Sequence, residues 1–481
     1  MSNMYVDFHC HPSMKPYGQS FSTGTPGSNS NRVKNKNSVW HYDPPNLFER
    51  ALQLFTGLVK FTQADCSSLA YGNVQIICPS LYPIERGFFN NKLGDGKLSD
   101  LANSFVTSVG RERVDFIQSV RNYFEDLERE YSFYKELSGQ KVKIPGGTYQ
   151  YQLVSSYREI EDYLSLHPDE NNVLFMVMSI EGLHSLNTDI DLSTPDEQAF
   201  LNNVRAIKNW QHPPFFVTFA HHFYNHLCGH ARSLTGIVGS VTNQEEGLGT
   251  GFTDLGKKVL KEVLSTANGK RIYVDIKHMS AVARKEYFNF LQTDLAGERL
   301  PVIISHGAAN GLRSVDDPVV DGKDTAYKLL AEDINFYDNE LVLVAKTGGI
   351  IGLQLDERRI ASENTLKQVK HSIFMNKIRH YRAELLWNQV QHIAELLDRN
   401  DLFAWDCIAI GSDFDGVINP LNGYLTTETM PFLSDYLERY AFNYMNERGK
   451  NTLKSYNQLT PAEIVNRIFI SNGAAFMKKW F

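Results

Sequence analysis

Two histidines, His9 and His11, close a short apolar run near the start of the chain, in Val6-Asp-Phe-His-Cys-His11. Side chains two positions apart on a β-strand project from the same face. Imidazole nitrogens in that arrangement can bind one divalent metal ion such as zinc. Such a pair also arises by chance, so its interpretation depends on what stands at the ends of the other apolar runs.

Four further apolar runs end in a histidine or a carboxylate: Glu181 after Met178-Ser-Ile, His278 after Val274-Asp-Ile-Lys, His306 after Ile303-Ile-Ser, and Asp413 after Ala409-Ile-Gly-Ser. Taken singly, each is more simply explained as a packed or surface residue. As a set, imidazoles and carboxylates without a thiolate suit zinc or a similar divalent ion. Without Asp413 the set has five candidate ligands, which exceeds what one structural zinc takes. A carboxylate such as Glu181 can bridge two ions. We therefore expect two divalent metal ions, with zinc favoured.

Asp413 adds a proton acceptor and donor to this set, as hydrolysis requires. Two metal ions about 3.5–4 Å apart can share a hydroxide as nucleophile and polarise a carbonyl oxygen. Asp413 would then hold the nucleophilic water, accept its proton and pass that proton to the leaving amine.

A second group of histidines follows another apolar run, in Phe219-Ala-His-His-Phe-Tyr-Asn-His-Leu-Cys-Gly-His230. His222, His226 and His230 would form a separate metal site if this segment were helical. Gly229 and the position at a strand end favour a polar loop instead. Within that loop, His221 is best placed to reach the metal centre or to polarise the substrate.

The elements that must position these residues are short, apolar and β-branched. Eight such runs alternate with segments of helical periodicity: Tyr5–Phe8, Val74–Cys78, Val173–Ser179, Phe215–Ala220, Ile272–Ile276, Val302–Ser305, Gly349–Leu353 and Cys407–Gly411. Several are almost continuously apolar, as strands buried on both faces should be. The alternation predicts an α/β fold, a (β/α)₈ barrel of the TIM type, in which all strand ends meet on one face. Apolar residues at helical spacing between Ile117 and Tyr134 predict one helix before the third strand.

Composition bounds the class of protein. The chain has 481 residues, of which 42% are hydrophobic, and a net charge of −7. Without a basic excess, nucleic acid is not an expected partner, and the longest apolar stretch, Val173 to Ile180, is too short for a membrane span. Five cysteines without CxxC spacing argue against a disulfide framework. No signal peptide is visible, which predicts a cytoplasmic location, although a mature exported form would look the same.

The length exceeds the roughly 250 residues of a typical barrel. We assign the excess to insertions near 14–45, 90–150, 314–340 and 357–385 of a single domain spanning 1–481, rather than to further domains. The polar segment Tyr17–Val39 is either a surface loop or a lid over the barrel mouth.

The strand-end segments resemble the renal, or membrane, dipeptidase family of zinc peptidases. The most specific match is Ile408-Ala-Ile-Gly-Ser-Asp-Phe-Asp-Gly-Val417. Supporting matches are Ser179-Ile-Glu-Gly182, Val274-Asp-Ile-Lys-His-Met-Ser280, Pro301-Val-Ile-Ile-Ser-His306, Gly251-Phe-Thr-Asp-Leu-Gly256 ahead of a helix, and the closing Ser471-Asn-Gly-Ala-Ala475. They occur in family order along the whole chain.

The resemblance implies a (β/α)₈ barrel with two zinc ions that hydrolyses dipeptides, so the expected partner is a small peptide-like substrate, and a homodimer is compatible with it. It implies two ligand groups, the first of His9, His11 and Glu181, and the second of Glu181, His278 and His306. It also implies that Asp413 is the acid/base and that His221 contacts the substrate near the scissile carbonyl.

Three positions depart from the family pattern. His11 stands where the family has an aspartate, which raises the net charge of the site and can change its metal preference. Ile334, in Ile334-Asn-Phe-Tyr-Asp338, replaces an arginine that binds the carboxylate of the dipeptide. Gln354, close to Arg358 and Arg359, replaces an aromatic residue and is a candidate substrate-binding residue. Arg313 is the candidate substitute for the missing arginine, whose loss should weaken recognition of a free C-terminus.

Two alternatives to a dipeptidase-like hydrolase remain open at this point. One is another metal-dependent hydrolase, of the phosphoesterase or deaminase type, whose first strand would also carry a D-x-H-x-H motif. The segment around Glu181 and the Ser-Asp-Phe-Asp-Gly motif fit that type less well. A non-catalytic barrel could retain the metal ligands, but binding alone does not need a proton carrier such as Asp413.

Overall fold

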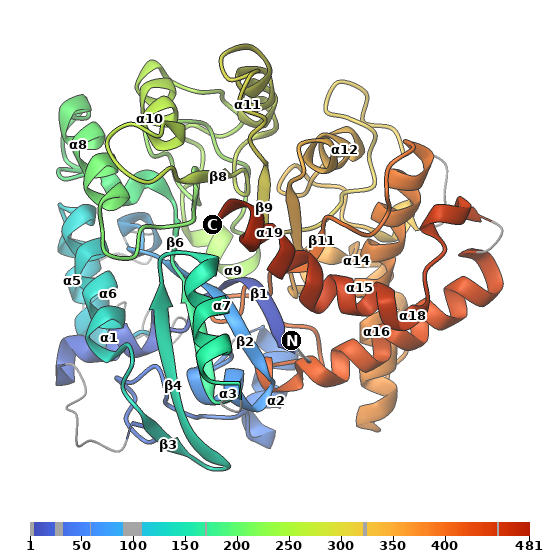
Figure 1. Ribbon diagram of the computed structural model, residues 1–481. Coiled ribbons are helices and arrows are strands. Elements are labelled where there is room, and N and C mark those ends of the chain that lie inside the picture. Colours follow the sequence, from blue (N-terminus) through green and yellow to red (C-terminus); the bar gives the residue numbers. More distant parts are fainter. Residues whose placement is uncertain are drawn as a thin grey trace.

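Parallel strands form the wall of a barrel at the centre of the molecule (Figure 1). A computed structural model of the protein describes residues 4–24, 32–57, 59–89, 108–168, 171–320, 325–449 and 452–481. The wall runs through β1 (Tyr5–Cys10), β2 (Val74–Leu81), β6 (Ser179–Glu181), β7 (Phe216–Thr218), β8 (Tyr273–Asp275), β9 (Ile303–Gly307), β10 (Ile350–Leu353) and β11 (Ile408–Ile410). Each of the eight predicted runs contributes a strand, and the α/β barrel is confirmed.

Contacts between the first and the last strand close the barrel. Cys10 forms an isolated parallel bridge with Phe414, just beyond β11. The backbone N–H of His11 donates to the carbonyl of Phe414 at 2.8 Å, and the N–H of Asp413 donates to the carbonyl of His9 at 2.9 Å. The two ends of the chain that carry the predicted site are thereby joined by backbone hydrogen bonds.

The third predicted strand, Val173–Ser179, is two separate strands in the structure. Its first half, β5 (Val173–Val177), pairs with β2 and with β4 (Gly147–Val154), and its second half, β6, pairs with β2 and β7. The hairpin of β3 (Val142–Ile144) and β4 therefore extends the sheet outside the barrel. This hairpin was not predicted; it lies within the segment expected only to be an insertion.

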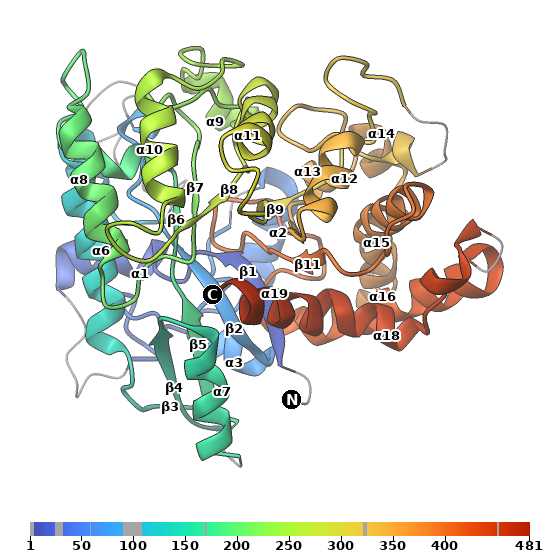
Figure 2. The same ribbon diagram turned by 45° about the horizontal axis from the view of Figure 1, so that its top comes forward.

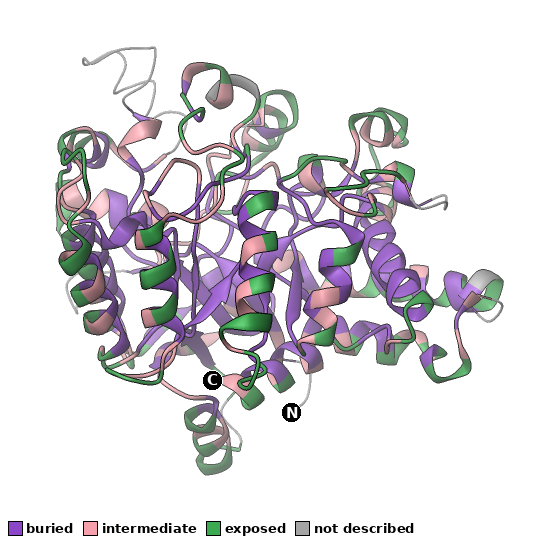
Figure 3. Ribbon diagram, turned by 90° about the horizontal axis from the view of Figure 1, so that it is seen from above, coloured by how far each residue is buried: buried purple, intermediate pink, exposed green. Residues whose placement is uncertain are grey.

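Helices surround the strands (Figure 2). Many of them bury the face turned to the sheet and expose the outer face (Figure 3). Their bounds are α1 (Met14–Thr23), α2 (Leu47–Thr56), α3 (Cys66–Tyr71), α5 (Arg111–Ser119), α6 (Tyr123–Leu137), α7 (Tyr157–Leu166), α8 (Glu197–Lys208), α9 (Gly236–Val241), α10 (Asp254–Leu264), α11 (Ala281–Thr293), α12 (Asp338–Lys346), α13 (Glu357–Ile360), α14 (Glu363–Gln368), α15 (Met375–Arg399), α16 (Met430–Tyr444), α18 (Pro461–Asn466) and α19 (Asn472–Trp480). The last of them, α19, packs on the barrel through Phe476, whose ring lies 5.8 Å from those of Phe8 and Phe215.

Two expectations concerned the connections between the strands. The single helix predicted between Ile117 and Tyr134 is wrong, because the backbone is extended at Val120 and the segment forms two helices, α5 and α6. Of the predicted insertions, residues 25–31, 90–107 and 321–324 lie outside the described residues, so only part of the Tyr17–Val39 segment can be placed.

All five cysteines are buried and unpaired. Among the helices of the described residues, none combines the length and the apolar character that a membrane crossing requires.

Candidate metal centre

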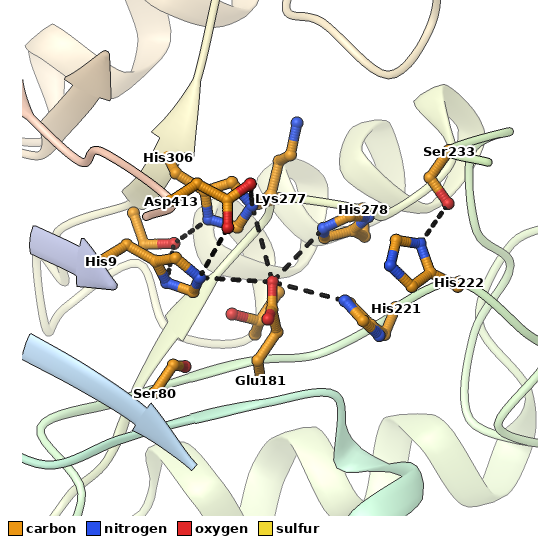
Figure 4. A network of polar contacts seen from close by, with 12 residues as sticks. His9, Ser80, Glu181, His221, His222, Ser233, Lys277, His278, His306 and Asp413 are labelled. Atoms are coloured by element: carbon orange, nitrogen blue, oxygen red, sulfur yellow. Dashed lines mark hydrogen bonds and ion pairs between the residues drawn. The ribbon is translucent and has the colours of Figure 1, made fainter. Parts of the chain in front are cut away.

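Glu181, at the end of β6, is the centre of a buried cluster of histidines (Figure 4). Its carboxylate oxygens lie 3.1 to 3.5 Å from the Nε2 atoms of five rings: His9, His11, His221, His278 and His306. These residues come from strand ends or the turns after them, as the barrel prediction requires. The strands are far apart in sequence, and the fold brings their ends to one point.

Two groups that share Glu181 could each hold a metal ion. The ligand atoms of His9, His11 and Glu181 lie within 4.8 Å of one another, and so do those of Glu181, His278 and His306. The Nε2 atoms of His9 and His11 are 3.1 Å apart. Two nitrogens bound to one tetrahedral zinc at about 2.0–2.1 Å would be about 3.3 Å apart, so the observed spacing suits a shared ion. The donor set of imidazoles and one carboxylate thus fits divalent metal.

Burial keeps part of this cluster in the form that binds metal. Burial lowers the pKa of His278 and that of His306 well below the ordinary value, with neighbouring histidines adding to the effect. A neutral imidazole has a lone pair to offer, whereas an imidazolium does not. Burial opposes ionisation of Glu181, but the charges of His221 and His9 outweigh it and hold the pKa of Glu181 well below its usual value. Glu181 therefore presents an ionised carboxylate to the neutral rings of His278 and His306.

A hydroxyl and a buried aspartate orient two of these rings. Ser305 donates its single hydroxyl proton from Oγ to Oδ2 of Asp275 at 2.6 Å. Toward the nearby rings, Oγ can therefore act only as an acceptor. Nδ1 of His306 lies 3.0 Å from that oxygen and Nδ1 of His9 lies 3.3 Å from it. With Nδ1 as the donor, each ring keeps its Nε2 lone pair directed at Glu181. Such hydrogen bonds are the usual support of metal-binding histidines.

Asp413 lies at the open side of the cluster. Its Oδ1 is 3.7 Å from Nε2 of His11, its Oδ2 is 3.9 Å from Nε2 of His306, and its side chain is 14% exposed. Burial and the negative charge of Glu181 raise the pKa of Asp413 well above the ordinary value. Its backbone has a left-handed φ of 61°, and a hydrogen bond from its N–H to His9 fixes this turn. Asp413 can therefore carry a proton beside the two ligand groups.

Glu85 is a residue of this site that the sequence did not reveal. It follows β2 and is buried, and its carboxylate accepts from Nδ1 of His221 at 2.9 Å. The Nε2 atom of that ring points to Glu181 at 3.4 Å. Burial disfavours a charged His221, but Glu85 and Glu181 outweigh it and raise the pKa of His221 to about 10. The only signal for Glu85 was its place after a predicted strand.

The other histidines of the His221 loop do not form a site of their own. The segment is not helical, and His226 has a left-handed φ of 62°. His230 contacts backbone carbonyls of Ala231 and Glu246. His222 instead joins His221 and His278 in a third group of potential ligands, with its Nδ1 2.6 Å from Oγ of Ser233. The polar-loop interpretation describes this segment.

A cavity of about 320 Å³ opens beside the cluster. It is lined by His278, His306 and Asp413, and by the polar residues Lys277, Gln354, Asp356, Arg358 and Arg359. The sequence-predicted Gln354 thus reaches the cavity. Arg313 does not line it, and its guanidinium pairs with Asp317 at 2.6 Å on the surface.

Ile334, where an arginine was expected, also lines the cavity. Its carbonyl oxygen lies 3.5 Å from Nζ of Lys277, a residue that the sequence did not single out. Burial lowers the pKa of Lys277 to about 7, and the nearby guanidinium of Arg359 adds to this effect. An amine is therefore present in this part of the cavity, in place of the expected guanidinium.

Comparison with known proteins relates the chain to a known family. Residues 149–459 match the family model described as membrane dipeptidase, peptidase family M19. A metallopeptidase from Rhodobacter sphaeroides, liganded with a phosphinate mimic of L-Ala-D-Ala, superposes with a TM-score of 0.51 over 99% of both chains at 12% identity. A dipeptidase of family M19 matches with a TM-score of 0.48 at 12% identity, covering 90% of this chain and 94% of that chain. Comparison with curated protein sequences gives no match.

Proposed function

Since the chain belongs to the membrane dipeptidase family, peptidase family M19, we propose that it hydrolyses the amide bond of a dipeptide or dipeptide-like compound with two bound metal ions. The observation that carries this proposal is the position of Glu181 between two groups of histidines, because a carboxylate shared in this way can join two ions. The family favours this reaction over those of a phosphoesterase or a deaminase.

The described residues supply two ligand groups. In our proposal His9, His11 and Glu181 hold one ion, and Glu181, His278 and His306 hold the other. Nitrogen and oxygen donors without thiolate make zinc the favoured ion. When bound, a pair of such ions polarises a carbonyl oxygen and supplies an activated water.

Asp413 is assigned the proton transfer. Its carboxylate lies beside both ligand groups and borders the cavity, so it can reach a water and a leaving amine. Burial and the charge of Glu181 raise its pKa, so this carboxyl holds a proton more readily than a free one does, which suits a proton donor. Asp413 would take a proton from the attacking water and deliver it to the amine as the amide bond breaks.

His221 is assigned the stabilisation of charge on the scissile carbonyl. Glu85 holds the ring from Nδ1, so that Nε2 is the atom that points into the cluster. A charged ring with Nε2 as donor stabilises the oxyanion that develops in amide hydrolysis. Arg313 lies on the surface, which leaves Gln354 as the substrate-binding candidate that lines the cavity.

The test is a hydrolysis screen of the zinc-loaded protein with L,L-dipeptides, L,D-dipeptides and their N-blocked and C-blocked derivatives. An L,D-dipeptide is included because the Rhodobacter sphaeroides structure holds a mimic of L-Ala-D-Ala. We expect turnover of at least one dipeptide class, lost on chelation and restored by zinc. Hydrolysis of phosphoesters or nucleobases with no turnover of any dipeptide would refute the proposal.

A further inference from the structure

Two buried donors line the cavity beside the metal centre: Nζ of Lys277, which has one carbonyl at 3.5 Å, and Nε2 of Gln354, which has no acceptor among the described residues. We propose that they form an anion subsite that binds the carboxylate of the amino acid released from the substrate. This inference rests on the proposed function for the identity of the substrate. The subsite itself rests on the contacts of these two residues.

Lys277 is a buried amine that makes no ion pair with a carboxylate among the described residues. Its side chain belongs to a residue only 2% exposed, on the turn between β8 and His278. The backbone N–H of Lys277 donates to Oδ1 of Asp275 at 3.0 Å, which fixes the turn. In the part of the chain that the structure describes, the only acceptor for its Nζ is the carbonyl of Ile334 at 3.5 Å. The carboxylates of Asp413, Asp275 and Glu181 act on it only from beyond ion-pair distance, so Nζ has donors left to bind an anion.

The direction of Lys277 separates it from the metal ligands. Figure 4 shows its side chain close to Asp413 and His278, with Nζ pointing away from Glu181. An anion bound to Nζ would therefore lie beside the cluster and would not replace a ligand within it. Because Asp413 lies on the same cavity wall, this is the side on which a leaving amine receives its proton in the proposed reaction.

Gln354 adds an independent donor. The residue directly follows β10, is 2% exposed, and its backbone N–H is fixed by the carbonyl of Gly307 at 3.0 Å. Its Nε2 has no hydrogen-bond partner among the described residues. Buried amide groups nearly always have partners, so an unmatched one on a cavity wall indicates a missing ligand. An ammonium and an amide N–H together match the two oxygens of a carboxylate.

The arginines of the same cavity are less suited to this role. Arg358 forms a two-pronged pair with Asp356, at 3.0 and 2.7 Å. Arg359 donates to the carbonyl of Ser233 and lies 3.6 Å from Glu332. Both guanidiniums are thus hydrogen-bonded or paired with a carboxylate, whereas Nζ of Lys277 contacts one carbonyl oxygen, that of Ile334.

The subsite replaces an expectation drawn from the sequence. Isoleucine at position 334 suggested weak recognition of a free C-terminus, but Lys277 places an ammonium against the backbone of that same residue. In a dipeptide, the carboxylate is separated from the leaving nitrogen by a single Cα. A carboxylate held by Lys277 and Gln354 would therefore hold that nitrogen near Asp413, which also lines the cavity.

The test compares one dipeptide, L-Ala-D-Ala, with its C-terminal amide on the zinc-loaded full-length protein. We expect the wild type to prefer the free carboxylate in kcat/KM by about 10- to 150-fold, the range of a hydrogen bond to a charged group. Lys277→Met should reduce this preference to near 1, mainly through KM, and Gln354→Leu should reduce it in part. Lys277→Arg should restore much of it. Lys285→Met, on the exposed side of α11, is the matched control and should keep the full preference.

Two results would overturn the subsite: an unchanged preference in Lys277→Met, or an equal loss with both compounds in each variant. Replacing a buried charge by a hydrophobic residue of similar size is generally tolerated, and Gln354→Leu provides a second reading if that variant does not fold. If neither compound is hydrolysed, calorimetric binding of the same two compounds tests the subsite alone. Tighter binding of the free carboxylate that is lost in Lys277→Met supports the subsite even though the proposed reaction fails, and equal binding overturns it.

Discussion

The carboxylate of Glu85 lies 2.9 Å from Nδ1 of His221, although the two residues are 136 positions apart in the chain. Both are buried, and the other nitrogen of the imidazole points to Glu181. A carboxylate in this position fixes the orientation of the ring and stabilises its charged form. Glu85 thus acts on the site through His221 rather than by touching substrate.

Replacing Glu85 by glutamine tests this positioning role. Glutamine keeps the size of the side chain but not its charge, so the charged form of His221 should lose one of the two carboxylates that stabilise it. We expect kcat to fall by up to about 100- to 1,000-fold, the range for loss of one oxyanion donor, with a smaller change in KM. Metal content, measured by elemental analysis, should stay at the wild-type level.

The matched control for that change is Glu245→Gln, which removes an exposed carboxylate paired with Arg232. Glu245 lies on the connection after β7 that also carries His221. It should leave kcat unchanged. Wild-type kcat in Glu85→Gln would remove Glu85 from this role, and loss of metal would show that it supports the metal centre instead.

Asp413→Asn separates proton transfer from metal binding. Asparagine has nearly the same shape but cannot carry the proton, so hydrolysis should fall by about 10²- to 10⁴-fold while the metal content is retained. Steady-state kinetics and elemental analysis of the same sample measure both quantities. Asp406→Asn, at an exposed carboxylate paired with Arg467, should behave as wild type. Retained hydrolysis in Asp413→Asn would exclude the assigned proton transfer.

Asp65 is predicted to make the stability of the protein depend on pH. It caps α3, where its carboxylate accepts from the backbone N–H of Ser68 at 2.9 Å. Burial raises the pKa of Asp65 from 3.8 to about 7, in spite of these hydrogen bonds. The folded protein then binds the proton more tightly than the unfolded chain does. The contribution to stability is therefore full below about pH 4 and is lost as the pH rises to about 7.

Asp65→Asn should remove this dependence, because asparagine is an equally good helix cap and does not titrate. The free energy of unfolding of the wild type, relative to that of the variant, should fall by about 4 kcal/mol between about pH 4 and pH 7. Urea unfolding across this range measures the difference. Parallel curves for the two proteins would contradict the raised pKa of Asp65.

The barrel could be predicted because its strands are buried on both faces and are therefore apolar throughout. The hairpin of β3 and β4 could not, since β4 begins with partly exposed residues and contains Gln150 and Gln152 in place of a continuous apolar run. The break between α5 and α6 was missed for a related reason. Apolar residues on both sides of Val120 keep helical spacing although the backbone turns there.

The histidines and carboxylates that the structure gathers at the cluster stood out in the sequence because each follows a strand end. Lys277 and Glu85 occupy the same kind of position, yet their side chains have no spacing that distinguishes them from surface charges. Their roles depend on burial and on contacts across the barrel, with Ile334 and His221 respectively. Such contacts join residues far apart in sequence, so one chain read alone cannot reveal them.

The central claim, hydrolysis by a centre of two metal ions built around Glu181, is tested most directly by titrating zinc into metal-free protein while following dipeptide hydrolysis. The account predicts no hydrolysis without zinc and a rise to a plateau at two zinc ions per chain. Full hydrolysis by the metal-free protein, or a plateau at one ion per chain, would contradict it.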